Sequence, residues 1–163
     1  MKVVKILLLV ILLGVGAVLV LAMTKPNTYH VDRSATISAP PAAVFANVDD
    51  LHRWESWSPW EKLDPAMKRT FNGPESGVGS SYGWVGNDKV GEGKMTITES
   101  VPDSHVGIRL DLIKPFESSS DVELDMAPEG EGTKVTWAMD GNHNLMSKVM
   151  CVFMSMDKMI GPD

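Results

Sequence analysis

Alternation of apolar and polar residues along most of the chain constrains its fold more than any other feature. Seven segments have the composition and spacing of strands: residues 29–37, 68–72, 79–85, 90–100, 105–113, 118–127 and 133–140. In the clearest of them, Val106, Ile108, Leu110 and Leu112 share one face. Successive side chains of a strand point to opposite faces, so the pattern predicts a sheet with one apolar and one hydrated face. The later segments are joined by short turns rich in Gly, Pro and Asp, which favours antiparallel neighbours.

Three other segments have helical spacing. A short helix through residue 48 opens with Pro40 and Pro41, since proline is tolerated in a first helical turn, and residues 51–57 predict a second one. Residues 144–160 place apolar side chains along one helical face, so we expect this helix to lie on the apolar face of the sheet. The simplest packing is an α+β fold in which a curved seven-stranded antiparallel sheet, with two short helices, grips a C-terminal helix.

The N-terminal segment predicts a membrane-spanning helix. Residues 6–23 contain no charged or strongly polar side chain, and 18 helical residues reach about 27 Å, close to the thickness of a bilayer core. We therefore expect a membrane anchor in residues 1–25 and a single ligand-binding domain in residues 26–163.

The same segment has an alternative interpretation as a cleaved signal peptide. Lys2 and Lys5 precede the apolar run, and the run closes on a small-residue pattern at Ala22. For a retained anchor, two lysines before the run against Lys25 after it favour a cytoplasmic N-terminus and an extracytoplasmic domain.

Charge and cysteine content argue against several classes of function. The chain has 15 Lys and Arg against 21 Asp and Glu, and without the three lysines of the first 25 residues the remainder carries a net charge of −9. Binding to nucleic acid needs clustered basic residues, so we expect no such partner. Cys151 is the one cysteine, the four histidines are scattered, and no HExxH or GxSxG motif occurs. We expect neither a metal nor a cofactor.

Aromatic and methionine residues are the candidates for a ligand site. Trp54, Trp57 and Trp60 fall within seven residues, and such rings suit the wall of an apolar cavity, although they could equally plug one end of a small core. Eleven methionines give adaptable apolar surface or simply fill the core. The residues that we expect around a ligand are Trp54, Trp57, Trp60, Tyr82, Trp84, Met95, Ile97, Glu99, Leu110, Trp137, Met139, Phe153 and Met156.

Three polar residues interrupt or border the apolar faces. Arg33 and Glu99 could meet inside the domain and orient the polar end of a ligand, because a buried charge needs a partner. Their alternative is snorkelling of long side chains at strand ends. Tyr82 is the third.

Several segments together resemble a known superfamily. They are Val31-Asp32-Arg33-Ser34, Ile37-Ser38-Ala39-Pro40, Val44-Phe45, Trp54-Glu55-Ser56-Trp57-Ser58-Pro59-Trp60, Gly77-Val78-Gly79-Ser80-Ser81-Tyr82-Gly83-Trp84 and Gly91-Glu92-Gly93-Lys94-Met95-Thr96-Ile97. The combination resembles the SRPBCC superfamily, and most closely its polyketide cyclase/dehydrase-like branch. That superfamily includes START lipid-transfer domains and Bet v 1-type proteins, and the resemblance covers residues 29–163.

The resemblance implies a helix-grip fold around a deep apolar cavity that binds lipids, sterols or polyketides. A minority of members catalyse cyclisation or dehydration, but the superfamily has no universal catalytic motif, so no residue here inherits a catalytic role. Members usually continue with further helical sequence beyond the position of residue 163. We therefore expect a C-terminal helix that covers only part of the sheet, with truncation of this helix as one explanation.

Three hypotheses for function follow. The first is a membrane-anchored module that binds an apolar small molecule between the sheet and the final helix. The second is an enzyme of the cyclase or dehydratase type, in which Glu99, Tyr82 or Arg33 acts on a bound polyketide. The third is an interaction domain of the cell envelope whose cavity is filled by its own side chains.

Overall fold

The computed structural model describes the backbone of residues 2–160 and the side chains of residues 2–158. One antiparallel sheet contains strands β1 (Thr28–Ile37), β2 (Lys68–Asn72), β3 (Ser81–Val85), β4 (Glu92–Val101), β5 (His105–Lys114), β6 (Ser118–Glu129) and β7 (Gly132–Asn142). The helical elements are α1 (Lys2–Met23), α2 (Pro41–Val48), η1 (Leu51–Arg53), α3 (Trp54–Trp57), η2 (Pro59–Lys62), α4 (Leu145–Phe153) and α5 (Met156–Ile160). The expected α+β class and the seven strands are confirmed.

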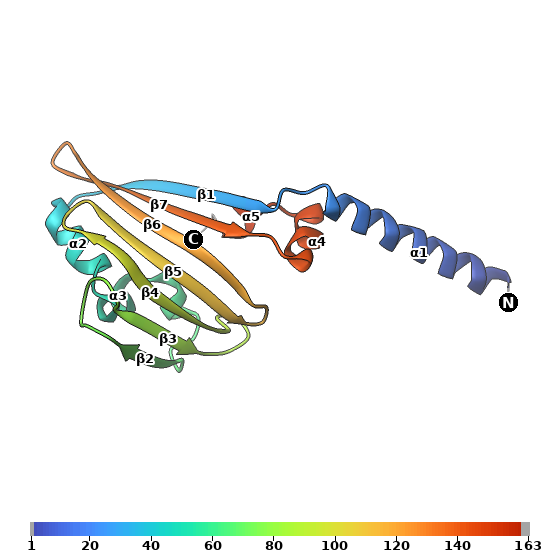
Figure 1. Ribbon diagram of the computed structural model, residues 1–163, viewed down its shortest axis with the longest axis horizontal. Coiled ribbons are helices and arrows are strands. Elements are labelled where there is room, and N and C mark those ends of the chain that lie inside the picture. Colours follow the sequence, from blue (N-terminus) through green and yellow to red (C-terminus); the bar gives the residue numbers. More distant parts are fainter. Residues whose placement is uncertain (1, 161–163) are drawn as a thin grey trace.

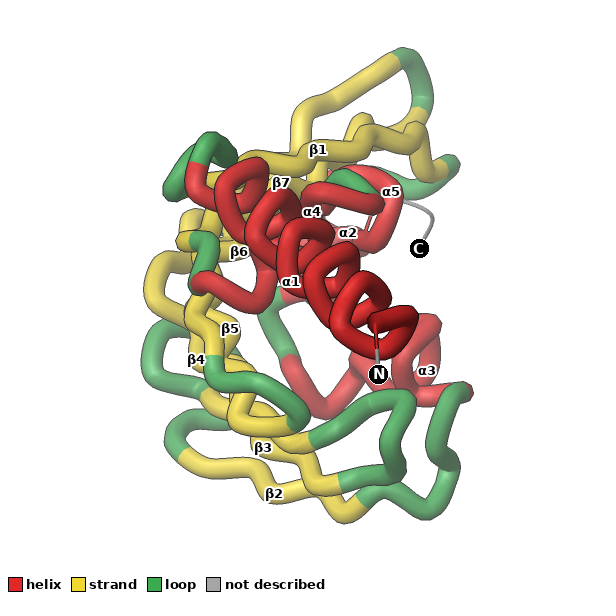
Figure 2. The backbone as a smooth tube through the Cα atoms, turned by 90° about the vertical axis from the view of Figure 1, so that its right-hand side faces the viewer, coloured by secondary structure: helices red, strands yellow, loops and turns green. Residues whose placement is uncertain are grey.

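The strands follow the order β1-β7-β6-β5-β4-β3-β2, so β2 to β7 form a meander (Figure 1). After β1 the chain passes through α2, η1, α3 and η2 to the opposite edge, and β1 pairs with the last strand, β7. The sheet curves, and α2 and α3 lie on its concave side (Figure 2). We call this side the inner face.

The core lies where α2 packs on the inner face. Val44 and Val48 of α2 are buried against apolar side chains of the central strands. Those residues occupy every second position along each strand. The register also sets them side by side on neighbouring strands, with Ile97 opposite Ile108 and Leu124 opposite Trp137. Their outward neighbours on β6 are exposed, and all but Ala127 are acids or serines, which confirms the hydrated outer face.

A β-bulge changes the face on which Glu99 lies. The pairing of β4 with β5 shifts between Ile97 and Glu99, so Glu99 stands opposite Gly107 while Ser100 stands opposite the buried Val106. Ser100 therefore points inward, where its hydroxyl donates to Asp49 at 2.7 Å, and Glu99 points outward beside His105 at 3.7 Å. The expected inward position of Glu99 was wrong, since strict alternation fails across a bulge.

The C-terminal segment forms two helices rather than one. Met154 has an extended backbone, which ends α4, and Ser155 then starts α5. Helix α4 packs against α1, and α5 packs against β1, so α4 does not cover the inner face as expected from its apolar spacing. Helical periodicity identifies an apolar face but not the surface that covers it.

Helix α1 extends away from the sheet as a single rod (Figure 1). Its 22 residues span about 33 Å, and Ala22, near its C-terminal end, is its one buried residue. Among the described residues, α1 is the one helix long and apolar enough to cross a membrane.

Candidate functional site

The inner face keeps a band of apolar side chains that are only partly covered. Trp84, Met95, Leu110, Val135 and Trp137 pack against the buried core but remain half-buried. They come from β3, β4, β5 and β7, so they extend across the sheet rather than along one strand. A surface of this kind can bind an apolar molecule by removing both partners from water.

Seven of the residues expected around a ligand share this inner face. Register places Tyr82 opposite Met95, Met95 opposite Leu110, and Val122 opposite Met139. The seven are Tyr82, Trp84, Met95, Ile97, Leu110, Trp137 and Met139. Tyr82, Ile97 and Met139 are buried, so Trp84, Met95, Leu110 and Trp137 supply the accessible surface.

The other expected residues lie apart from this band. Glu99 is on the outer face, and Phe153 is 76% exposed on α4. Met156 is half-buried on α5 beside β1. Arg33 sits on the inner side of β1, where it donates to Asp157 at 2.8 Å. Of the two alternatives for Arg33 and Glu99, a pairing inside the domain is wrong, because the two side chains point to opposite faces from strands at well-separated positions in the sheet.

The tryptophan-rich segment fastens α3 to α2. The indole N–H of Trp54 donates to the carbonyl of Val48 at 3.0 Å, and that of Trp57 donates to the carbonyl of Asn47 at 3.2 Å. The two rings contact each other with their centroids 4.7 Å apart. Trp54 is half-buried, whereas Trp57 and Trp60 are 40% and 49% exposed. The hydrogen bonds give Trp54 a structural role, and the exposed rings form a surface outside the core.

A buried polar cluster closes the β2–β3 end of the inner face. Glu61 of η2 is 7% exposed, and its Oε1 accepts the hydroxyl of Tyr82 at 2.5 Å. Its Oε2 accepts from Nε and Nη2 of Arg69 at 2.9 and 2.7 Å. The Arg69 Nη1 donates to the carbonyl of Met67 at 3.0 Å. We call Glu61, Arg69 and Tyr82 the polar cluster.

The polar cluster fixes the protonation state of its tyrosine. Burial, and then the hydrogen bond to Glu61, raise the pKa of Tyr82 above its ordinary value. The hydrogen bond to Glu61 likewise raises the pKa of Arg69. Tyr82 therefore stays a neutral hydroxyl beyond the pH at which an ordinary tyrosine ionises, and this hydroxyl donates its hydrogen bond to Glu61. With both carboxylate oxygens of Glu61 occupied, the arrangement holds β2, β3 and η2 together.

Aromatic side chains continue from the cluster in both directions. The ring of Phe71 stacks on Tyr82 with centroids 5.0 Å apart, and His52 stacks on Phe71 at 4.1 Å. The ring centroid of Trp84, two residues along β3, lies 5.9 Å from that of Tyr82. The indole N–H of Trp84 donates to the carbonyl of Val90 at 3.0 Å. This row forms a rigid aromatic wall along the β2–β3 edge.

Sequence reasoning missed Glu61 and Arg69. The signal for Arg69 was its position two residues before Phe71, which places a charge on the inner face of β2. Its partner could not be identified in this way, because Glu61 belongs to the short 3-10 helix η2, which has no repeating apolar pattern. Among the described residues, no group of three or more His, Cys, Asp and Glu side chains could hold a metal ion.

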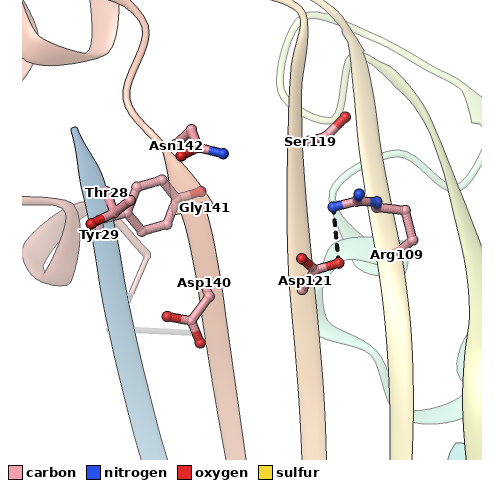
Figure 3. Close-up of a pocket in the computed structure, with 8 residues that line it drawn as sticks. All are labelled: Thr28, Tyr29, Arg109, Ser119, Asp121, Asp140, Gly141 and Asn142. Atoms are coloured by element: carbon pink, nitrogen blue, oxygen red, sulfur yellow. Dashed lines mark ion pairs between the residues drawn. The ribbon is translucent and has the colours of Figure 1, made fainter.

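A separate polar groove of about 160 Å³ lies mainly on the outer side of the sheet (Figure 3). Arg109 and Asp121 form an ion pair of 2.9 Å at one side of it, and Asp140 lies at the other. Its size and charged lining differ from those of pockets for apolar ligands, which have about 300–1,000 Å³ and mostly apolar walls. We therefore place the candidate site on the inner face.

Comparison with protein families decides the assignment. A family model described as polyketide cyclase/dehydrase and lipid transport matches residues 28–154. The chain belongs to this family. The match runs from the first residue of β1 to the residue after α4, so the whole sheet and its inner face lie within the polyketide cyclase/dehydrase and lipid transport domain.

Solved structures share the fold of this domain at low sequence identity. Protein MLL2253 from Mesorhizobium loti is 19% identical, with a TM-score of 0.57 over 82% of this chain and 89% of its own. Ara h 8.0201 is 11% identical, with a TM-score of 0.54 over 83% of this chain and 99% of its own. The Aha1 dimer from Colwellia psychrerythraea is 13% identical, with a TM-score of 0.52 over 78% of this chain and 98% of its own. These likenesses confirm the helix-grip-like fold, and the family match places the chain in the SRPBCC superfamily. A search of curated proteins found no match.

Proposed function

We propose that this chain is a membrane-anchored protein that binds an apolar small molecule, such as a lipid, sterol or polyketide, on the inner face of its sheet. The observation that carries the proposal is the half-buried band of Trp84, Met95, Leu110 and Trp137 over a buried core. Covering such a band stabilises a complex by about 25 cal/mol for each Å² of apolar surface removed from water.

Arg69 is the group best placed to orient a ligand. Its side chain is 19% exposed, and its hydrogen bonds to Glu61 and Met67 use three of its five N–H donors. A carbonyl or carboxylate at one end of an apolar ligand can accept from the donors that remain. Glu61 and Tyr82 then act as positioning residues that hold Arg69 at the edge of the apolar band.

Membrane anchoring is supported by α1. Almost all of its apolar side chains are exposed, which is unfavourable in water and favourable in a bilayer. We propose that α1 stays attached as a single-pass anchor with residues 26–163 on the extracytoplasmic side, as the lysine distribution favours.

The binding proposal is tested by what copurifies with the full chain. Native mass spectrometry and solvent extraction of protein purified in mild detergent would identify and quantify bound apolar molecules. Leu110→Gln places an amide within the apolar band, so we expect the amount of bound molecule per protein to fall several-fold. Ile113→Gln is the matched control, because Ile113 lies three residues away on β5, on the outer face, and is 45% exposed.

Two results would contradict the proposal. One is a folded protein that carries no apolar molecule above the level found with detergent alone. The other is equal loss of the bound molecule in Leu110→Gln and Ile113→Gln.

A further inference from the structure

Helix α4 exposes an apolar side where a helix on a soluble surface exposes a polar one. Its outward side chains are apolar: Phe153 is 76% exposed, Leu145 61%, Met146 50% and Met150 41%. Its half-buried side holds Ser147 and Lys148 together with the apolar Val149, Cys151 and Val152. A helix on a hydrated surface exposes polar side chains instead, so the outer side of α4 is suited to an apolar medium.

Sheet register places α4 at the base of α1. Thr28, the first residue of β1, pairs with Asn142, the last residue of β7, so the chain enters and leaves the sheet at the same corner. Helix α1 precedes this corner, and α4 follows it. The two helices are in contact there, and Figure 1 shows α4 beside the sheet-proximal end of α1.

Hydrogen bonds fix α4 to the link between α1 and the sheet. The backbone N–H of His143 donates to the carbonyl of Asn27 at 2.7 Å. The Nζ of Lys148 donates to the side-chain oxygen of the same asparagine at 2.5 Å. These contacts set the level of α4 along the axis of α1, next to the last turn of that helix.

We infer that α4 lies in the surface of the lipid bilayer beside α1, with Met146, Met150 and Phe153 at the boundary between headgroups and acyl chains. The inference rests on the proposed anchoring by α1. A spanning α1 brings its C-terminal end to the membrane surface, and α4 is held at that level. Interfacial helices bury their apolar face about 5–10 Å into this boundary.

Charge and continuity favour a bilayer over a protein as the occupant of this surface. Helix α4 contacts α1, and the last turn of α1 also exposes apolar side chains, since Leu21 is 51% and Met23 76% exposed. Lys25 and Lys148 lie at the same corner of the molecule, where they are attracted to anionic lipid headgroups. A single apolar surface bordered by cations is typical of contact with an anionic membrane.

Site-specific fluorescence quenching tests this placement in the full chain. In a Cys151→Ser background, an environment-sensitive nitrobenzoxadiazole label is attached to Phe153→Cys, and separately to Leu12→Cys in α1 and Glu123→Cys on the outer face. The protein is reconstituted in vesicles of phosphatidylcholine with one quarter phosphatidylglycerol that contain nitroxide-labelled lipid. We expect lipid quenching at position 153 to exceed that at position 123 several-fold, with weaker quenching by aqueous iodide.

A charged variant of the same surface provides a second measurement. Met146→Glu combined with Met150→Glu should abolish lipid quenching at position 153 and leave that at position 12 unchanged. Both positions are half-exposed, so the helix itself is retained. Circular dichroism checks that the fold persists.

The outcomes separate the two proposals. Strong lipid quenching at position 12 with iodide quenching at position 153 would overturn the placement of α4 and keep α1 as an anchor. Protection of position 153 from both quenchers would overturn it in favour of a second copy or another protein on this surface. Absence of lipid quenching at position 12 would overturn the anchor, and the placement of α4 with it.

Discussion

The hydroxyl of Tyr82 on β3 donates to the carboxylate of Glu61 in η2 at 2.5 Å, across 21 residues of sequence. The second carboxylate oxygen accepts two N–H groups of Arg69 on β2. One buried carboxylate thus joins an edge strand, its neighbour and the turn that precedes both. Because a buried charge without partners is strongly unfavourable, the integrity of this end of the inner face depends on all three side chains.

Removal of the tyrosine hydroxyl should destabilise the domain. Tyr82→Phe leaves one oxygen of the buried Glu61 without a donor, and we expect the free energy of unfolding to fall by about 2 kcal/mol. Urea denaturation of the full chain in mild detergent measures the change. Tyr29→Phe is the matched control, because the Tyr29 hydroxyl bonds to the neutral Ser120 at 2.8 Å, and we expect a loss of about 1 kcal/mol. An equal loss in both variants would show that the charge of Glu61 does not matter.

The ion pair of Glu61 and Arg69 should be coupled. Glu61→Gln leaves Arg69 without its main counter-charge, and because Arg69 is 19% exposed we expect a loss of about 2–3 kcal/mol, below the 3–5 found for fully buried pairs. Glu61→Gln combined with Arg69→Met should cost less than the sum of the single variants. A double-mutant cycle by urea denaturation measures the coupling, and strict additivity would contradict a direct interaction.

Two histidines should titrate on opposite sides of pH 6.5. The hydrogen bond to Asp140 and its charge raise the pKa of His30 above 6.5. Burial, and then the charge of Lys148, lower the pKa of His143 below 6.5. Titration followed by NMR would measure both midpoints. Asp140→Asn should return His30 toward 6.5, whereas Lys148→Met should raise the midpoint of His143 only part of the way, since burial is the larger cause.

The two shifts have opposite effects on stability. The depressed pKa of His143 contributes stability above pH 6.5 that is lost as the pH falls through its folded value. The raised pKa of His30 contributes stability below pH 6.5 that is lost as the pH rises through its folded value. Replacing His143 with Gln should therefore weaken the dependence of stability on pH on the acidic side of 6.5. An unchanged acid limb in urea titrations would contradict this assignment.

Gly93 provides the space in which the indole of Trp84 lies. A Cβ at this position would stand 2.5 Å from Cζ2 of Trp84 and 2.9 Å from the carbonyl oxygen of Asp111. Gly93→Ala should displace the indole, weaken its bond to Val90 and lower the free energy of unfolding by about 1–3 kcal/mol. Gly83→Ala is the control, since the nearest atoms there are 3.8 Å away. Tryptophan fluorescence and urea denaturation would distinguish the two, and equal behaviour would contradict this packing.

Local patterns in the sequence predicted most of the elements because they depend on neighbouring residues. Alternation along residues 105–113 and 118–127 placed two strands nearly at their observed bounds and assigned their inner faces correctly. The same reasoning failed for Glu99, because the bulge beside it arises from the pairing of β4 with Gly107 on β5. A strand taken alone does not reveal where its partner forces an extra residue.

The sequence by itself determined the number of strands, their antiparallel direction, the apolar N-terminal helix and the apolar composition of the inner face. These follow from side-chain periodicity and turn residues, which act over a few positions. Only the tertiary structure decided that Glu61, Arg69 and Tyr82 meet, and that α4 packs on α1 instead of covering the sheet. Both depend on which surfaces come together in three dimensions, where burial and hydrogen bonding between distant segments outweigh local preference.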